Sequence, residues 1–116
     1  MDPQIPEKIM QSKCEVSYRF ENPSLGPIDG RRAFRIFLDH GRLMKILDLQ
    51  TGKEADRSRG TPGLSIVLAW LRGEMKKDRY LYRTLHGKEL IQPSSPKGLG
   101  GGFRIEIDPP VCLPPR

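Results

Sequence analysis

Residues 14–20 read CEVSYRF, and this short stretch decides the kind of fold that the chain can adopt. Its apolar members alternate with polar ones: Cys14, Val16, Tyr18 and Phe20. Such alternation is typical of a β-strand that places one face on a hydrophobic core and the other face in solvent. The stretch therefore predicts a half-buried strand, which ends at the turn-forming residues 22–24.

A second segment has the periodicity of a helix. Thr61 and Pro62 form a start signal, because threonine caps helices and proline is favoured at the first helical position. The apolar residues that follow recur at three- and four-residue spacing: Leu64, Val67, Leu68, Leu71 and Met75. This spacing predicts a helix with one core-facing stripe, and Trp70 lies off that stripe.

Further strands are expected in the C-terminal half of the chain. Residues 79–85 alternate again, and His86 with Gly87 could turn the chain into a second strand over residues 88–92. Residues 103–107, FRIEI, predict a last short strand, which Asp108-Pro109-Pro110 closes. The segment 79–92 is therefore interpreted as a β-hairpin.

Residues 31–49 fit either a helix or a strand. Phe34, Phe37 and Leu38 have helical spacing, whereas Phe34, Ile36 and Leu38 alternate as in a strand. We favour a helix over about residues 30–39, capped by Asp29. A break at residues 40–41 would then precede a second short element.

Together these elements predict an α+β fold, a small single domain in which a short antiparallel sheet packs against one or two helices. A length of 116 residues is typical of one domain. We expect residues 1–12 to form a flexible N-terminal arm, because they are polar and lack periodicity. Residues 13–108 would form the domain, and residues 109–116 a proline-rich disordered tail. The segment 93–102, PSSPKGLGGG, is expected to be flexible as well.

The two cysteines, Cys14 and Cys112, lie near opposite ends of the chain. A disulfide between them would require an oxidising compartment, and we expect two reduced thiols instead. Neither has a cysteine or histidine at ligand spacing, so no metal site is predicted. Residues 1–11 lack the apolar core of a secretory signal, and the longest apolar run, 63–71, is about half of what a bilayer requires. We therefore expect a cytoplasmic or nuclear protein without a transmembrane segment.

Positive charge is concentrated in one part of the sequence. The chain has 20 Lys and Arg against 14 Asp and Glu, a net charge of +6. Such an excess favours association with polyanions. Between residues 57 and 88, two acidic residues accompany eight basic ones: Arg57, Arg59, Arg72, Lys76, Lys77, Arg79, Arg83 and Lys88. We predict that these eight residues bind a phosphate-rich partner, nucleic acid first and an anionic membrane surface second.

Two further observations bear on this prediction. Trp70, Tyr80 and Tyr82 are interleaved with the basic residues, and such rings can stack on exposed bases. An ordinary solvated helix face is the alternative. Glu74 and Asp78 would then pair with neighbouring cations for a few tenths of a kcal/mol each.

No motif indicates catalysis. His40 and His86 each stand beside a glycine in a predicted turn, and no nucleophile with an orienting base accompanies either one. The chain has no Walker loop, no dinucleotide-binding fingerprint and no metalloprotease motif, and the glycines at 98–102 are interpreted as a linker. We therefore expect no enzymatic activity, no cofactor and no small-molecule substrate.

Two short motifs resemble those of the PilZ family. Arg31 and Arg35 match its R-x-x-x-R motif, and Asp56 and Ser58 match the start of its D/N-x-S-x-x-G motif. The nearest glycines depart from the pattern, because they come one residue early and two residues late. In that family the two motifs bind cyclic di-GMP beside a β-barrel. The resemblance therefore implies a ligand site at these four residues, as an alternative to polyanion binding.

The small size, basic charge and loose ends also resemble those of viral matrix or accessory proteins. Proteins of that kind bind ribonucleoprotein or acidic lipid headgroups and self-associate. The resemblance implies a structural protein that forms a homo-oligomer. A protein–protein interaction or self-assembly module, with the leucine-rich helix as its interface, is thus a third alternative.

Overall fold

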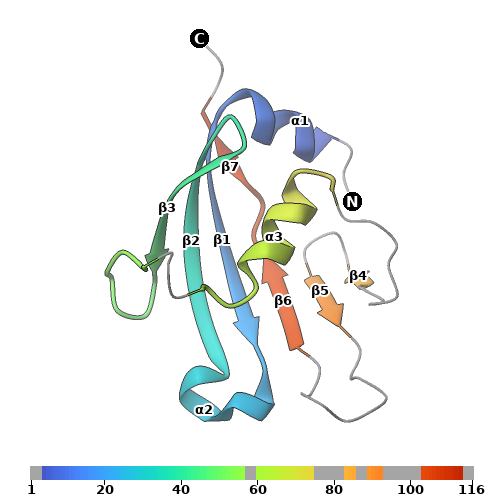
Figure 1. Cartoon of the computed structure of the whole chain (residues 1–116). Helices are drawn as coiled ribbons and strands as arrows, with labels where there is room; N and C mark the ends of the chain where they lie inside the picture. The colour runs from blue at the N-terminus through green and yellow to red at the C-terminus, as the bar shows by residue number, and fades with distance from the viewer. Residues whose placement is uncertain (1–3, 57–59, 75–82, 86–88, 93–102, 114–116) are drawn as a thin grey trace.

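The computed structural model describes residues 4–56, 60–74, 83–85, 89–92 and 103–113. One antiparallel sheet contains β1 (Lys13–Glu21), β2 (Arg31–Asp39), β3 (Arg42–Asp48), β4 (Arg83–Leu85), β5 (Glu89–Gln92), β6 (Phe103–Ile107) and β7 (Val111–Cys112). The helices are α1 (Gln4–Gln11), α2 (Gly26–Asp29) and α3 (Leu64–Leu71), and a short 3-10 turn, η1 (Pro23–Leu25), precedes α2. The fold is α+β, as the sequence predicts (Figure 1).

Strand β1 organises the sheet, whose order is β3-β2-β1-β6-β5-β4. It pairs along its whole length with β2. On its other side, its last four residues pair with β6 and Cys14 and Glu15 pair with β7. The prolines at 109–110 separate β6 from β7, because proline cannot donate a hydrogen bond to a sheet ladder.

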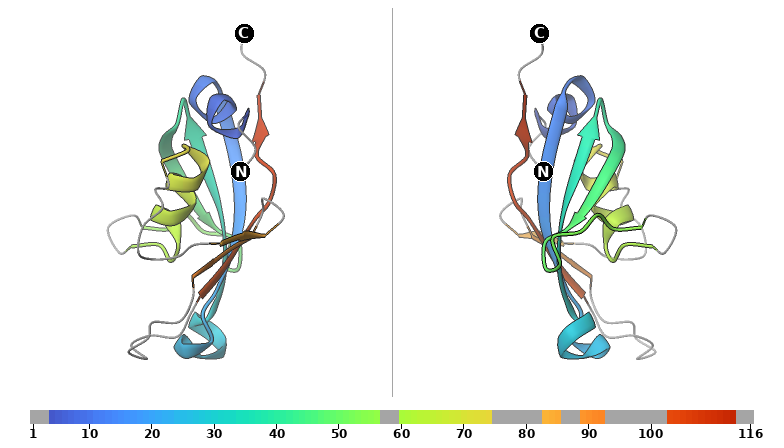
Figure 2. Two further views of the ribbon diagram at one scale, coloured as in Figure 1. Left: turned by 90° about the vertical axis from the view of Figure 1, so that its right-hand side faces the viewer. Right: turned by 90° about the vertical axis from the view of Figure 1, so that its left-hand side faces the viewer.

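The hydrophobic core lies on one face of this sheet, where α1 and α3 pack (Figure 2). The core side of β1 consists of the residues whose alternation the sequence shows: Cys14, Val16, Tyr18 and Phe20. Ile9 of α1 and Val67 and Leu71 of α3 are fully buried against it. The opposite face of the sheet carries the polar members of the alternation and is not covered by any of the described helices.

The prediction of a helix over residues 30–39 is wrong, because residues 31–39 form β2. Phe34, Ile36 and Leu38 alternate along β2 and are buried, so the alternative interpretation of this segment as a strand is correct. The sequence of this segment fits the spacing of a helix and of a strand equally well. Its pairing with β1 along the whole strand favours the strand. Asp29 ends α2 and does not cap a helix at 31.

The break expected at residues 40–41 is confirmed as a tight hairpin turn between β2 and β3. His40 and Gly41 both have positive φ, 51° and 81°. A two-residue turn with this conformation matches the twist of the flanking strands, and glycine adopts it without steric cost.

Two described segments near the ends of the chain are more ordered than the sequence predicts. Residues 4–11, expected to belong to a flexible arm, form α1 and contribute the buried Ile9 to the core. Residues 111–112, expected to belong to a disordered tail, form β7. Cys14 and Cys112 face each other in the β1–β7 register and are joined by a disulfide, so the expectation of two reduced thiols is corrected.

The other sequence-based expectations are partly confirmed. The hairpin is present as β4 paired with β5, and β6 has the predicted bounds. The predicted helix begins at Leu64 instead of Thr61, because Gly63 at its N-cap adopts a left-handed conformation. The segment 93–102 lies outside the described residues.

Gly63 also allows α3 to approach the sheet closely. A Cβ atom at this position would lie 3.0 Å from Cδ1 of Ile105 and 3.2 Å from Cδ2 of Phe20. Its φ of 75° disfavours any other residue as well. Because Gly63 has no side chain, the start of α3 can pack closely against β1 and β6.

Tyr18 fixes the segment before α3 to the sheet. Its buried hydroxyl donates a hydrogen bond to the Pro62 carbonyl over 2.8 Å. Burial raises the pKa of the Tyr18 phenol far above its usual value, and the opposing effect of the nearby Arg32 is smaller. The folded state therefore holds this proton more tightly than the unfolded chain.

A pH-dependent contribution to stability follows from Tyr18. The contribution is fully present below pH of about 10, where the unfolded phenol is protonated, and is lost as the pH rises above that value. Tyr18→Phe should cost about 1 kcal/mol at neutral pH, because the Pro62 carbonyl loses its donor, and should reduce the loss of stability above pH 10. Urea unfolding at pH 7 and pH 10.5 measures both effects. An equal alkaline loss in both proteins would contradict the assignment to Tyr18.

Candidate functional site

Arg72 is the only one of the eight predicted contact residues whose side chain the structure describes, and its guanidinium is engaged. Arg72 follows the last turn of α3, and its Nε donates to the Gly41 carbonyl over 2.9 Å, with Nη2 donating to the same oxygen. The side chain thus links the end of α3 to the β2–β3 turn. This arrangement indicates a structural role for Arg72.

The other predicted contact residues are placed only in part. Arg83 is the first residue of β4, at the edge of the sheet, and its backbone pairs with Ile91. The remaining six lie outside the described residues: Arg57, Arg59, Lys76, Lys77, Arg79 and Lys88. The structure does describe the residues on either side of these segments.

The charge of the chain is strongly segregated between these segments and the rest. Side chains are described for residues 5–56, 60–74 and 103–113, which contain eleven Lys and Arg and eleven Asp and Glu. Residues 57–59 and 75–88 contain seven basic residues and one acidic residue. The described framework is therefore electrically balanced, and these two segments hold an excess equal to the whole net charge of +6.

The segment 57–59 is anchored on both sides. Before it, Ala55 N donates to the Ile46 carbonyl over 2.8 Å, and Leu47 forms an isolated β-bridge with Glu54. After it, the Pro62 carbonyl accepts the Tyr18 hydroxyl. Arg57 and Arg59 therefore lie between two points that are hydrogen-bonded to the sheet.

Asp48 shapes the loop that leads to this segment. Its Oδ1 accepts the Gln50 amide over 2.9 Å, and its Oδ2 accepts Nη2 of Arg32 over 2.8 Å. Burial opposes ionisation of Asp48, but the bonds from Gln50 and Arg32 outweigh it and hold the pKa of this carboxyl below its usual value. At neutral pH the ionised Asp48 thus fastens residues 48–51 to β2.

The segment 75–82 begins directly after the end of α3. Gly73 has a φ of 71° and its amide donates to the Trp70 carbonyl, while Glu74 N donates to the Ala69 carbonyl over 2.8 Å. These bonds close the C-terminal end of the helix. The described residues that flank 75–82 are therefore Glu74, after the end of α3, and Arg83, at the start of β4.

Trp70 is not available to a ligand. It is 3 % exposed and belongs to the core between α3 and the sheet, although the sequence places it off the core-facing stripe. Its indole nitrogen has no hydrogen-bond partner among the described residues. The suggestion that Trp70 stacks on bases is therefore wrong, and Tyr80 and Tyr82 lie outside the described residues.

The open face of the sheet carries cations of its own, but several are already paired. Arg19 forms an ion pair with Glu106, and Nε of Arg35 donates to Oγ of Ser17 over 3.1 Å. This face therefore resembles an ordinary polar surface more closely than a surface that binds a polyanion.

The four residues of the alternative site are only partly brought together. Arg31 and Arg35 lie within β2 on its open face, whereas the PilZ resemblance implies that the first motif precedes a barrel. Asp56 is exposed in the loop after β3, and Ser58 lies outside the described residues. The sheet is an open one with β3 and β4 at its edges.

Among the described residues, no group of three or more His, Cys, Asp or Glu side chains could hold a metal ion. No helix in the described part of the chain is long and apolar enough to cross a bilayer.

Comparison with known proteins adds no relative. No protein-family model, no curated protein and no solved structure matches this chain. A functional conclusion therefore depends on the residues and the geometry given above.

Proposed function

We propose that this protein is a non-enzymatic binding module for a phosphate-rich polyanion, with nucleic acid as the first candidate. The basic segments 57–59 and 75–88 would make the contacts, and the charge-balanced sheet and helices would hold them. The single observation that carries the proposal is the segregation of charge: seven basic residues against one acidic residue in these segments, and equal numbers in the described framework.

The physical basis is the release of counterions from a polyanion. Each phosphate that a lysine or arginine neutralises releases condensed cations, which makes binding favourable at low salt without any reading of base sequence. The anchoring of both segments at their ends limits the loss of chain entropy on binding. Arg72 is left out of the contact set, because its guanidinium already binds the Gly41 carbonyl.

A salt titration tests the proposal. For about five phosphate contacts, we expect fluorescence anisotropy to give a plot of log K against log[salt] with a slope near −4 to −5 for duplex DNA and about −3.5 for single-stranded RNA. Anionic vesicles and cyclic di-GMP are measured in parallel. A flat response between about 50 and 300 mM salt would falsify the proposal. Binding confined to vesicles or to cyclic di-GMP would favour the membrane or the PilZ-like alternative.

A further inference from the structure

A groove lies on the open face of the sheet, beside the N-terminal end of β1. Its volume is about 460 Å³, within the range of ordinary ligand sites. Phe37 and Met44 form one wall, and Val111 of β7 and the following Leu113 form the other. The sequence gives no sign of this groove, because its two walls come from segments about 70 residues apart in the chain.

A convex apolar tip lies at the other end of the molecule. It consists of η1 and α2, which connect β1 to β2. Ile28 is 81 % exposed and Leu25 is 51 % exposed, and the prolines at 23 and 27 are exposed beside them. Since a solvated turn is usually polar, an aliphatic tip of this kind indicates a contact surface.

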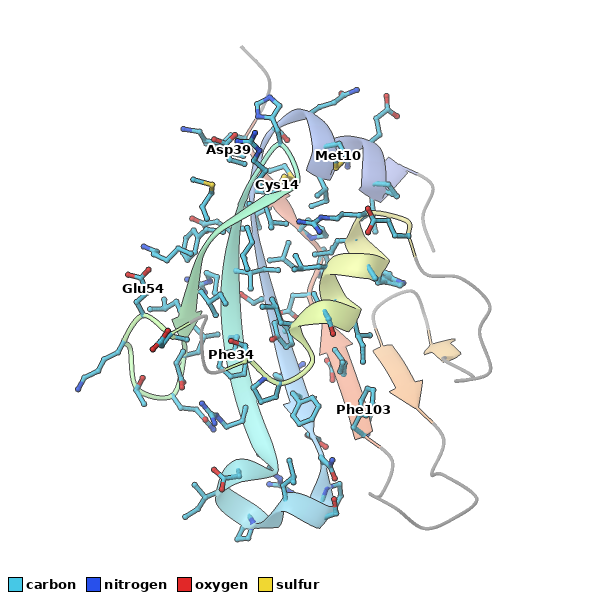
Figure 3. The ribbon with its side chains drawn as sticks, in the orientation of Figure 1. Met10, Cys14, Phe34, Asp39, Glu54 and Phe103 are labelled. Atoms are coloured by element: carbon cyan, nitrogen blue, oxygen red, sulfur yellow. A yellow bond between two sulfur atoms is a disulfide. The ribbon has the colours of Figure 1, made fainter. Side chains whose placement is uncertain are left out.

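The groove and the tip lie at opposite ends of β1. The groove includes Lys13 at the start of the strand, and η1 follows soon after Glu21 at its end. At the usual rise per residue the two features are about 25 Å apart. In Figure 3, Asp39 and Cys14 mark the groove end of the sheet, far from α2.

Exposed apolar side chains concentrate at these two places. Seven large hydrophobic residues are exposed among the described residues, and five of them belong to the groove or the tip: Leu25, Ile28, Met44, Val111 and Leu113. Single exposed residues need no explanation, but two clusters of them do.

The charges around the two features are complementary as well. The groove is bordered by Lys13 and by the acidic Glu15 and Asp39. A hydrogen bond with His40 holds the pKa of Asp39 below its usual value, and Asp39 is a carboxylate at neutral pH. The tip is flanked by exposed residues of both signs, Asp29 and Arg31. Asp29 can therefore meet Lys13 while Arg31 meets the acidic side of the groove.

We propose that the protein associates head to tail with itself: the α2 tip of one copy docks into the groove between β3 and β7 of the next. Each copy keeps a free tip at one end and a free groove at the other, so the contact does not close and can extend into a linear assembly. The surfaces are small, and the association belongs to the weak, transient class. This inference is independent of polyanion binding.

Sedimentation velocity in the absence of any polyanion tests this contact. The wild-type protein, at concentrations from about 10 µM to about 1 mM, should sediment as progressively larger species without a plateau at the dimer. Ile28→Asp, which removes the tip, and Val111→Asp, which alters the groove, should each give a monomer. Leu49→Asp is the matched control, because Leu49 is exposed but belongs to neither feature, and it should associate like the wild type.

Mixing the two monomeric variants distinguishes this geometry from others. The Ile28→Asp protein retains its groove and the Val111→Asp protein retains its tip, so an equimolar mixture should form a 1:1 dimer and no larger species. Circular dichroism of each variant shows whether it is folded. A wild-type monomer at all concentrations overturns the proposal and leaves the groove to a different ligand. Association that survives Ile28→Asp but not Val111→Asp overturns it in favour of a groove-to-groove dimer, and a folded mixture that stays monomeric overturns it too.

Discussion

Reduction of the Cys14–Cys112 disulfide should lower the free energy of unfolding by about 4 kcal/mol, since the bond closes a loop of nearly 100 residues. The physical reason is chain entropy: a cross-link over a sequence separation of 98 removes many conformations from the unfolded state. A fall of this size is a large part of the stability of a small domain. Chemical denaturation of the oxidised and reduced wild-type protein measures it.

The double variant Cys14→Ser/Cys112→Ser is the second arm of this experiment. It removes the cross-link without leaving a thiol that can form other disulfides, and it should match the reduced wild type to within about 1 kcal/mol. Amide hydrogen exchange adds a local measurement. The Leu113 amide, which donates to the Lys13 carbonyl over 2.9 Å, should lose protection first because β7 pairs only through two residues. Equal stability of the oxidised and reduced proteins would contradict the prediction.

Charge reversal of the segment after α3 should have the largest effect on binding. The triple variant Lys76→Glu/Lys77→Glu/Arg79→Glu removes three cations from the proposed contact set. From the counterion-release relation, the loss of three contacts lowers affinity for RNA or DNA by about 100-fold at 150 mM salt and makes the salt slope less negative by about 3. Fluorescence anisotropy at several salt concentrations measures both quantities.

A second triple variant separates local contacts from total charge. Lys8→Glu/Arg42→Glu/Lys53→Glu changes the net charge by the same amount but lies on exposed positions of the balanced framework. Its slope should stay close to that of the wild type, with only a modest loss of affinity from long-range electrostatics. Equal losses in the two variants would show that net charge alone governs binding. Arg72 is unsuitable for such a test, because its removal would leave the Gly41 carbonyl without its donor.

The predictable part of the fold is the part that local periodicity determines. The alternation at 14–20 and 103–107 predicts β1 and β6, because each strand buries one face on the core. Residues 31–39 fit the periodicity of a helix and also that of a strand. They form a strand because they pair with β1, and no local pattern in the sequence reveals this pairing. The ordering of α1 depends in the same way on partners that are distant in sequence, because this helix contacts β2 and α3.

The candidate site, like the fold, is predictable from the sequence only in part. The concentration of positive charge between residues 57 and 88 is visible in the sequence, because it is a matter of composition. The structural role of Arg72 is not visible in the sequence, because its partner Gly41 lies 31 residues away, in the turn between β2 and β3. The burial of Trp70 likewise follows from how α3 sits on the sheet, which the helical stripe alone does not specify.

The link between Cys14 and Cys112 also makes the molecule a covalent ring over most of its length. A protease that cuts the backbone once anywhere between these residues opens the ring without releasing a fragment. A singly cleaved chain would migrate as a single covalently linked species on a non-reducing gel and as two pieces after reduction. The basic segments 57–59 and 75–88 both lie within the ring, so a cut in either one leaves its two ends attached to the same sheet.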